Sequence, residues 1–388
     1  MGQAPPWPNF SETEGELVKE VLLSNKVNYW TGKEARYFEK EYAEYFGSKH
    51  SIALANGTLA IDLALLALGV GAGDEVIVTP RSFIASASSV VNNGAVPVFA
   101  DVDNESQNLT AETIAPVVTT RTKAIICVHL AGWPCEMDDI LELASAHNLA
   151  IIEDCAQAHG ASYRGKSVGT IGQAGAWSFC QDKIMTTGGE GGMITLDDEK
   201  LNKIMWSYKD HGKSLEKVNT PNASTGFRYI HDSIGTNWRL TEMQAALGRY
   251  QLAQLCGWVD QRRKNARALI EGLAETTGVR LTVPPDHVSH AYYKFYFFVE
   301  PTALKSGWDR DRIVAEIHQR GVPCFTGSCP EIYKEQAFTE RYGIHPTLPV
   351  AASLGGSSVM LNVHPGITEE HCEQTADTIR EVFALATR

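Results

Sequence analysis

The chain has 388 residues with a formal net charge of −12, and 44% of its residues are hydrophobic. This length exceeds that of one small domain and fits one large domain plus one smaller domain. The acidic balance, without a concentrated basic segment, argues against nucleic acid as a partner. No apolar run is long enough to span a membrane, and residues 1–10 lack the features of a signal peptide. We therefore expect a cytoplasmic protein that binds neither nucleic acid nor membrane.

The eight cysteines are dispersed along the chain. None belongs to a C-x-x-C pair, and no Cys/His cluster has the spacing of a zinc site. We expect these thiols to be reduced and mostly buried, as free cysteines usually are, and we expect no metal centre.

The chain begins with two predicted helices and continues with alternating strands and helices. Ser11 followed by Glu14 is typical of a capping box at a helix start, and residues 34–46 carry an aromatic residue at every fourth position of one helical face. From about residue 51, short apolar segments alternate with helical stretches, a pattern typical of buried parallel strands. These segments are residues 51–55, 75–79, 96–100, 124–129, 150–153 and 174–179.

The pattern changes beyond about residue 250. Residues 252–273 predict one long helix, 293–299 an alternating aromatic strand, and 310–320 and 369–384 two further helices. We therefore predict an α/β fold with a mostly parallel sheet flanked by helices in a large domain, residues 1–255. A smaller C-terminal α+β domain follows, residues 256–388.

Chemically useful residues follow the predicted strands, where ligands of open parallel sheets bind. Gly57 and Thr58 open a helix, whose free N–H groups favour an anion such as phosphate, and Phe83 can stack on an aromatic ring. Asp154 can hold a ring nitrogen protonated, and Lys183 can form a Schiff base with a carbonyl. Singly, each residue also has an ordinary explanation: a helix cap, a core side chain, a salt-bridge partner or a solvated lysine.

Two glycine patterns narrow the choice of cofactor. The run Gly188-Gly189-Glu190-Gly191-Gly192 lacks the Gly-Lys-Ser/Thr ending of a phosphate-binding loop, so we interpret it as tight backbone packing. No G-x-G-x-x-G joins a strand to a helix, which argues against a nucleotide-dependent dehydrogenase.

In their order along the chain, these motifs resemble those of the DegT/DnrJ/EryC1/StrS sugar aminotransferases, which have the aspartate aminotransferase-like fold of fold-type I pyridoxal-phosphate enzymes. The resemblance runs from Tyr29 to about residue 255 and is looser in the small domain. The segments that carry it are Tyr29-Trp30-Thr31-Gly32, Asn56-Gly57-Thr58-Leu59-Ala60, Gly73-Asp74-Glu75-Val76-Ile77, Val128-His129-Leu130-Ala131-Gly132, Glu153-Asp154-Cys155-Ala156-Gln157-Ala158-His159-Gly160-Ala161, Ser178-Phe179 before Lys183, Glu190-Gly191-Gly192 and Gly235-Thr236-Asn237-Trp238-Arg239-Leu240-Thr241-Glu242.

The resemblance implies a role for each matching residue. Lys183 would carry pyridoxal 5′-phosphate (PLP) and act as the acid and base of the reaction. Asp154 would pair with the ring nitrogen, Gln157 would bond the phenolic oxygen and Phe83 would stack on the ring. The phosphate would be held by Gly57, Thr58 and Ser178, and by Asn237 of the neighbouring subunit, which implies a homodimer with shared active sites.

The implied reaction moves an amino group from an amino acid, usually L-glutamate, through the PMP form of the cofactor. The acceptor would be a 3- or 4-keto position of a deoxy sugar on a nucleoside diphosphate. Such products serve amino-sugar biosynthesis for surface polysaccharides such as the O-antigen of lipopolysaccharide. This placement rests on the resemblance alone.

The chain departs from the family pattern at Cys180-Gln181-Asp182, at the additional pair Gly188-Gly189 and at residues 325–333 of the small domain, where substrate recognition is expected. Three alternatives therefore stay open. They are a PLP enzyme acting on a cyclitol or another keto substrate, a sugar dehydratase, and a non-catalytic regulator on the same fold. Lys183 argues against the dehydratase, for which we expect histidine at that position, and the presence of Lys183 and Asp154 argues against the regulator.

Overall fold

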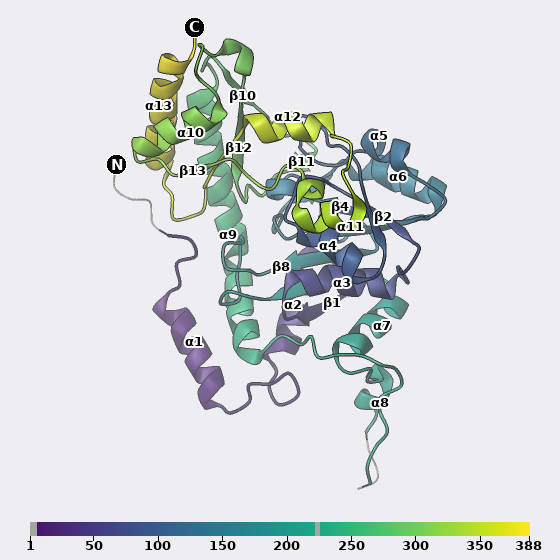
Figure 1. The fold of residues 1–388 in the computed structure, drawn as a ribbon. Helices are drawn as coiled ribbons and strands as arrows, with labels where there is room; N and C mark the ends of the chain where they lie inside the picture. The colour runs from purple at the N-terminus through teal and green to yellow at the C-terminus, as the bar shows by residue number, and fades with distance from the viewer. Residues whose placement is uncertain (1–5, 222–225) are drawn as a thin grey trace.

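The computed structural model describes residues 6–221 and 226–388, and its centre is a seven-stranded sheet with helices on both faces (Figure 1). Neighbouring strands pair in parallel from β8 to β3, whereas β9 runs antiparallel to both β1 and β8. In sheet order the strands are β1 (His50–Leu54), β9 (Gly192–Leu196), β8 (Ala174–Ser178), β5 (Ala150–Asp154), β4 (Thr122–Val128), β2 (Glu75–Val78) and β3 (Val96–Phe99). The predicted mostly parallel sheet is confirmed.

Strand β9 is absent from the sequence prediction because it begins within the glycine run. A Cβ added to Gly192 would lie 2.3 Å from the carbonyl oxygen of Asn56, and one added to Gly191 would lie 2.1 Å from Oγ1 of Thr187. These close approaches confirm the predicted tight packing for Gly191 and Gly192, whereas a Cβ on Gly189 would meet no atom within 4 Å. The glycines also make the start of the strand hard to predict from the sequence, because glycine lacks the β-branched and aromatic side chains that are typical of strands.

Alternating residues of each strand point to opposite faces of the sheet, as the two-residue period of a strand requires, and they pack into hydrophobic cores on both faces. On one face, Ile52 and Leu54 pack with α3 and its neighbours, while Ala53 points to the other face and packs with α2. The first face is covered by α3 (Gly57–Ala67), α4 (Ala85–Asn92) and α7 (Glu199–Lys209), and the second by α2 (Glu34–Phe46), α6 (Met137–His147) and the first half of α9 (Glu242–Leu273).

Helix α9 connects the two parts of the molecule (Figure 1). It begins at Glu242, ten residues before the predicted start, because Thr241 and Gln244 form a capping box there. Its residues up to Val259 pack in the large-domain core, and those from Ala266 onward pack in the small-domain core. The proposed boundary at residue 255 lies inside this helix.

The C-terminal part is an antiparallel sheet covered by helices, as predicted for an α+β domain. Its strands, in sheet order, are β10 (Val279–Leu281), β12 (Phe295–Val299), β14 (Ser358–Leu361) and β13 (Cys324–Phe325). Its helices are α10 (Arg310–Gln319), α11 (Gln336–Tyr342), α12 (Pro349–Ser357) and α13 (Glu369–Ala386).

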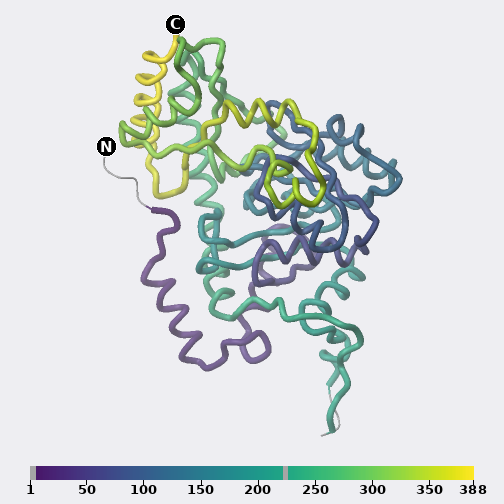
Figure 2. Tube along the Cα trace, viewed as in Figure 1, coloured from purple at the N-terminus to yellow at the C-terminus, as the bar shows by residue number. Residues whose placement is uncertain are grey.

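The remaining elements lie at the periphery. Helix α1 (Glu12–Leu23) has the predicted Ser11–Glu14 capping box and runs beside α9, so the first described residues reach the small domain (Figure 2). The others are α5 (Ala111–Ile114), α8 (Leu215–Asn219), the short 3₁₀ helices Ala115–Val117, Leu130–Gly132, Pro301–Ala303 and Ile332–Lys334, and a three-stranded sheet of β6 (Ser162–Tyr163), β7 (Lys166–Ser167) and β11 (Val288–Ser289). Over residues 6–221 and 226–388, no helix has the length and apolar character needed to cross a membrane.

Candidate active site

One cavity of about 1260 Å³ lies at the carboxyl ends of β5 and β8 and extends to the small domain. Its far wall includes residues of β13, β14 and α9. The structure brings together in its lining seven of the eight predicted site residues, namely Gly57, Thr58, Phe83, Asp154, Gln157, Ser178 and Lys183.

The start of α3 and the end of β8 form the first part of the site. Asn56 caps α3 by accepting the N–H of Leu59 at 3.0 Å, so the N–H groups of Gly57 and Thr58 lie in the first turn, where helix geometry gives them no partner. A Cβ on Gly57 would lie 2.6 Å from Cβ of Ser178. Only glycine therefore lets these two segments meet. The result is a group of N–H and hydroxyl donors suited to an anion.

Asp154 is the last residue of β5 and is 6% exposed. Its Oδ2 accepts a 2.7 Å hydrogen bond from the hydroxyl of Ser86, and its Oδ1 accepts the N–H of Ala156 at 3.1 Å. Sequence analysis missed Ser86. The sequence feature that could have identified Ser86 is its position at the start of a helix, three residues after Phe83.

Gln157 follows Asp154 in a turn and not in a helix. Its Oε1 accepts the N–H of Ala131 at 2.8 Å, which fixes the amide and assigns Nε2 as the remaining donor. Gln157 is 6% exposed and lines the cavity, so this donor is available to a ligand there.

Lys183 lies in the loop after β8, with its Nζ 5.0 Å from the ring centroid of Tyr293. Its carbonyl oxygen accepts the indole N–H of Trp7 at 2.8 Å. The hydroxyl of Tyr293 donates to the carboxylate of Asp182, and burial together with that carboxylate raises the pKa of Tyr293 well above its usual range. A second lysine, Lys294, lines the same cavity, and burial lowers its pKa to about 8.

Phe83 and Asn237 are the two exposed members of the predicted set. The Phe83 side chain is 66% exposed and lines the cavity, so it is not the core residue that its type alone would favour. Asn237 is exposed, its backbone pairs with Asp210, and it lies outside the cavity lining of its own chain.

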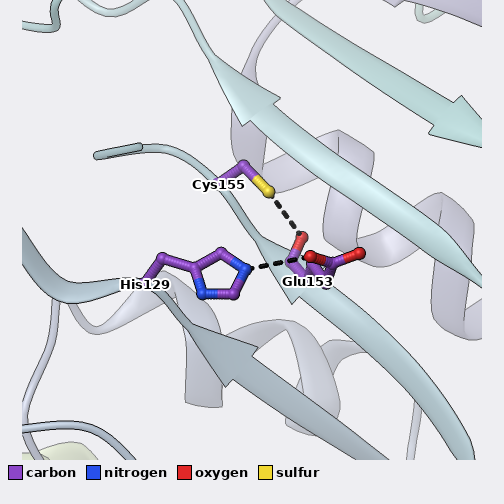
Figure 3. A group of neighbouring side chains, drawn as sticks. All are labelled: His129, Glu153 and Cys155. Atoms are coloured by element: carbon purple, nitrogen blue, oxygen red, sulfur yellow. Dashed lines mark hydrogen bonds and ion pairs between the residues drawn. The ribbon is translucent and has the colours of Figure 1, made fainter. Parts of the chain in front are cut away.

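The buried group His129, Glu153 and Cys155 has the composition of a metal site, but hydrogen bonds already occupy its ligand atoms (Figure 3). The N–H of Cys135 donates to Nδ1 of His129 at 3.0 Å, so Nε2 carries the proton and donates to Glu153. Glu153 also accepts three backbone N–H groups, from Gly169, Ile171 and Gly172, each at 2.7 Å. Burial alone would raise the pKa of Glu153, but these bonds outweigh it and lower that pKa. We therefore assign the group a structural role.

The sequence matches the DegT/DnrJ/EryC1/StrS aminotransferase family over residues 8–380. GDP-perosamine synthase of Caulobacter vibrioides is 37% identical over 382 residues, which cover 97% of each chain. A crystal structure of an aminotransferase from Psychrobacter cryohalolentis is 55% identical and has a TM-score of 0.96, covering 98% of this chain and 99% of that one. DesV of S. venezuelae, solved with a ketimine intermediate, is 31% identical with a TM-score of 0.85, covering 95% of this chain and 94% of that one.

A family match over nearly the whole chain agrees with a cavity that gathers a lysine, an aspartate and a group of N–H and hydroxyl donors. The chain belongs to the DegT/DnrJ/EryC1/StrS aminotransferase family and is an aminotransferase that uses pyridoxal phosphate.

Proposed function

We propose that this enzyme transfers an amino group from L-glutamate to a 3- or 4-keto position of a deoxy sugar linked to a nucleoside diphosphate. The observation that carries the proposal is the size and position of the cavity. Its volume of about 1260 Å³ exceeds the roughly 300–1,000 Å³ of ordinary small-molecule sites, so it has room for a cofactor and a large second substrate. The name of the Caulobacter relative, GDP-perosamine synthase, supports a nucleotide-linked sugar.

The residues of the cavity fit the cofactor. The N–H groups of Gly57 and Thr58 and the hydroxyls of Thr58 and Ser178 would hold its phosphate at the start of α3. Asp154 would pair with the ring nitrogen. The two hydrogen bonds that Asp154 accepts leave further lone pairs on its carboxylate for this contact.

Three side chains complete the proposed cofactor site. Gln157 would donate its free amide N–H to the phenolic oxygen. Phe83, exposed in the cavity, would stack on the ring. Lys183 would bind the cofactor covalently through its amine.

The chemistry divides between cofactor and protein. When bound, pyridoxal phosphate supplies an electron sink that lowers the barrier to removing a proton beside the amino group. Asp154 keeps the ring nitrogen protonated, which maintains that capacity. The amine of Lys183 would accept the proton from the substrate carbon and return it one position away, so that the donor leaves as a keto acid and its amino group is retained for transfer to the ketone.

We also propose a homodimer with shared active sites, acting in the cytoplasm in the synthesis of surface polysaccharides. Two features support the dimer. Asn237 matches a cofactor-binding position but lies outside the cavity of its own chain. The segment around α8 projects from the body (Figure 2), and beyond it Phe227, Tyr229 and Ile234 are 83%, 86% and 91% exposed. A second copy would cover such apolar side chains.

The function is tested by two consecutive half-reactions. Adding L-glutamate to the PLP-loaded enzyme should bleach its visible absorbance and release 2-oxoglutarate, and a nucleotide-linked 3- or 4-keto-deoxy sugar should then restore that absorbance. Failure of the first step with L-glutamate but success with another amino acid would refute the proposed donor. Restoration only by a free cyclitol ketone would instead replace the sugar substrate.

A further inference from the structure

The loop that carries Lys183 belongs to no helix or strand. It covers residues 179–191, all of them described, between the end of β8 and the start of β9. Within it, the N–H of Lys183 donates to the carbonyl oxygen of Cys180 at 3.1 Å. Because no ladder of backbone hydrogen bonds runs through this loop, the position of Lys183 depends on the contacts that fasten the loop to its surroundings.

The first of these contacts comes from Trp7, near the start of the chain. Its indole N–H donates to the carbonyl oxygen of Lys183 itself at 2.8 Å. An indole nitrogen can only donate, so the direction of this bond is unambiguous. Trp7 also lines the cavity, together with Lys183. The N-terminal segment therefore reaches the backbone of the proposed cofactor lysine at the wall of the site.

The ring of Trp7 is in turn held by side chains outside the loop. Trp258 meets it edge-on, with the ring centroids 5.1 Å apart and the planes at 90°. His364 lies nearly parallel to it at 5.8 Å, and Cζ of Arg262 lies 5.1 Å from its centroid. Trp258 and Arg262 belong to α9, and His364 follows β14. Trp7 thus joins the carbonyl group of Lys183 to two well-packed elements.

A second contact joins the same N-terminal segment to the loop. Oε1 of Gln251 on α9 accepts the N–H of Thr186 at 2.7 Å, and Nε2 of Gln251 donates to Oε1 of Glu14 on α1 at 2.7 Å. Gln251 and Glu14 are both buried. Helix α1 runs beside α9 (Figure 2), so the loop is fastened at Lys183 and again three residues later, at Thr186.

We propose that Trp7 is a positioning residue, which sets where the amine of Lys183 lies in the cavity by holding the backbone of that lysine. The proposal rests on the proposed role of Lys183 in binding the cofactor. There, the amine nitrogen replaces the aldehyde oxygen of PLP, and this oxygen leaves with the two amine protons as water. The phosphate would be anchored at the start of α3, so the bond forms only where the amine reaches the aldehyde carbon. Positioning raises the effective concentration of the amine at that carbon.

The test compares two probes on the full-length enzyme freed of cofactor. PLP carries the aldehyde that reacts with a lysine. Pyridoxine 5′-phosphate has the same ring and phosphate but an alcohol in place of the aldehyde, so it cannot form the covalent bond. Equilibrium dialysis gives a dissociation constant for each probe, and the ratio of the two constants isolates the contribution of Lys183.

Trp7→Phe keeps an aromatic ring and removes the indole donor. We expect it to weaken PLP binding about 3- to 10-fold, on the scale of one lost hydrogen bond, and to change pyridoxine phosphate binding less than about twofold. Gln251→Met breaks the second contact with a side chain of similar length and should act in the same direction. Trp308→Phe changes a partly buried tryptophan outside the cavity lining and should match wild type.

A second readout does not depend on affinity. At full PLP occupancy, the fraction of chains that borohydride labels on Lys183 should fall in Trp7→Phe and stay unchanged in Trp308→Phe. Equal weakening of both probes by Trp7→Phe would show that Trp7 supports the site only generally and would overturn the proposal, and so would an unchanged affinity for PLP. If Trp7→Phe failed to fold, Gln251→Met would decide by the same criteria. If wild type bound both probes equally, the proposed role of Lys183 would fall, and that of Trp7 with it.

Discussion

The hydroxyl of Ser86 donates a 2.7 Å hydrogen bond to Oδ2 of Asp154. Because Oδ1 of the same carboxylate accepts the N–H of Ala156, both oxygens are fixed and the carboxylate has one orientation in a buried site. In the proposed role of Asp154, that orientation decides how well it pairs with the ring nitrogen of the cofactor.

Ser86→Ala should lower turnover about 3- to 10-fold, the effect of losing one hydrogen bond of about 1 kcal/mol while the carboxylate stays in place. Asp154→Asn should reduce turnover far more, because the ring nitrogen loses its carboxylate partner. Steady-state assays of the PLP-saturated variants measure both effects. Ser88→Ala, partly exposed on the same helix, is the control, and a Ser86→Ala enzyme with wild-type turnover would show that this bond does not matter.

Gly57→Ala should weaken retention of the cofactor at least about 10-fold, because the new methyl group must displace the end of β8 from the proposed phosphate site. The added Cβ would lie 2.6 Å from Cβ of Ser178. Equilibrium dialysis against PLP measures the change. Gly15→Ala, in α1 with no atom within 4 Å of the added Cβ, should retain the cofactor as wild type does. Equal retention by both variants would contradict the proposed phosphate site.

Mixing two inactive variants tests the shared active site. In a mixture of Lys183→Ala and Asn237→Ala chains, each heterodimer would combine one intact lysine with the intact asparagine of its partner. Random exchange of subunits should then restore about a quarter of the wild-type sites. Activity that stays at the level of the separate variants after proven subunit exchange would show that Asn237 acts with Lys183 of its own chain and would contradict the shared site.

His290 should make the protein less stable in acid. Burial, with Arg263 nearby, lowers its folded-state pKa to about 3, whereas an unfolded histidine titrates near 6.5. Between these values the unfolded state binds a proton that the folded state does not, so stability falls as the pH drops, by up to about 1.4 kcal/mol per pH unit. His290→Asn removes the titration and keeps an acceptor for the N–H of Tyr292. Its Tm should therefore fall less than that of wild type between pH 7 and pH 5, and an equal fall would contradict this assignment.

The sequence predicted the elements whose signals are local. The motif residues lie at or directly after the ends of predicted strands, and ligands of such sheets bind there. The positions of Gly57, Asp154, Ser178 and Lys183 along the chain were therefore enough to predict that they share one cavity. The start of α9 was missed because its capping box lies in a segment without strong apolar periodicity, and β9 was missed because it begins in glycines.

The small-domain wall of the cavity could not be predicted, for a different physical reason. Arg262, Lys294 and His364 come from three elements of the small domain, separated by tens of residues, and each is an ordinary residue in its own segment. Only packing of the small domain against the large one brings these residues into the same cavity as Lys183.

The central claim is that Lys183, and not Lys294, carries the cofactor, although both line the cavity. Lys294 is held by Oδ1 of Asn362 at 3.0 Å on the small-domain side, whereas Lys183 follows Ser178 at the proposed phosphate site. Reducing the PLP-loaded enzyme with borohydride and mapping the labelled peptide by mass spectrometry distinguishes the two lysines. We predict the reduced cofactor on Lys183. A label on Lys294, or no label on a protein that retains PLP, would contradict the account.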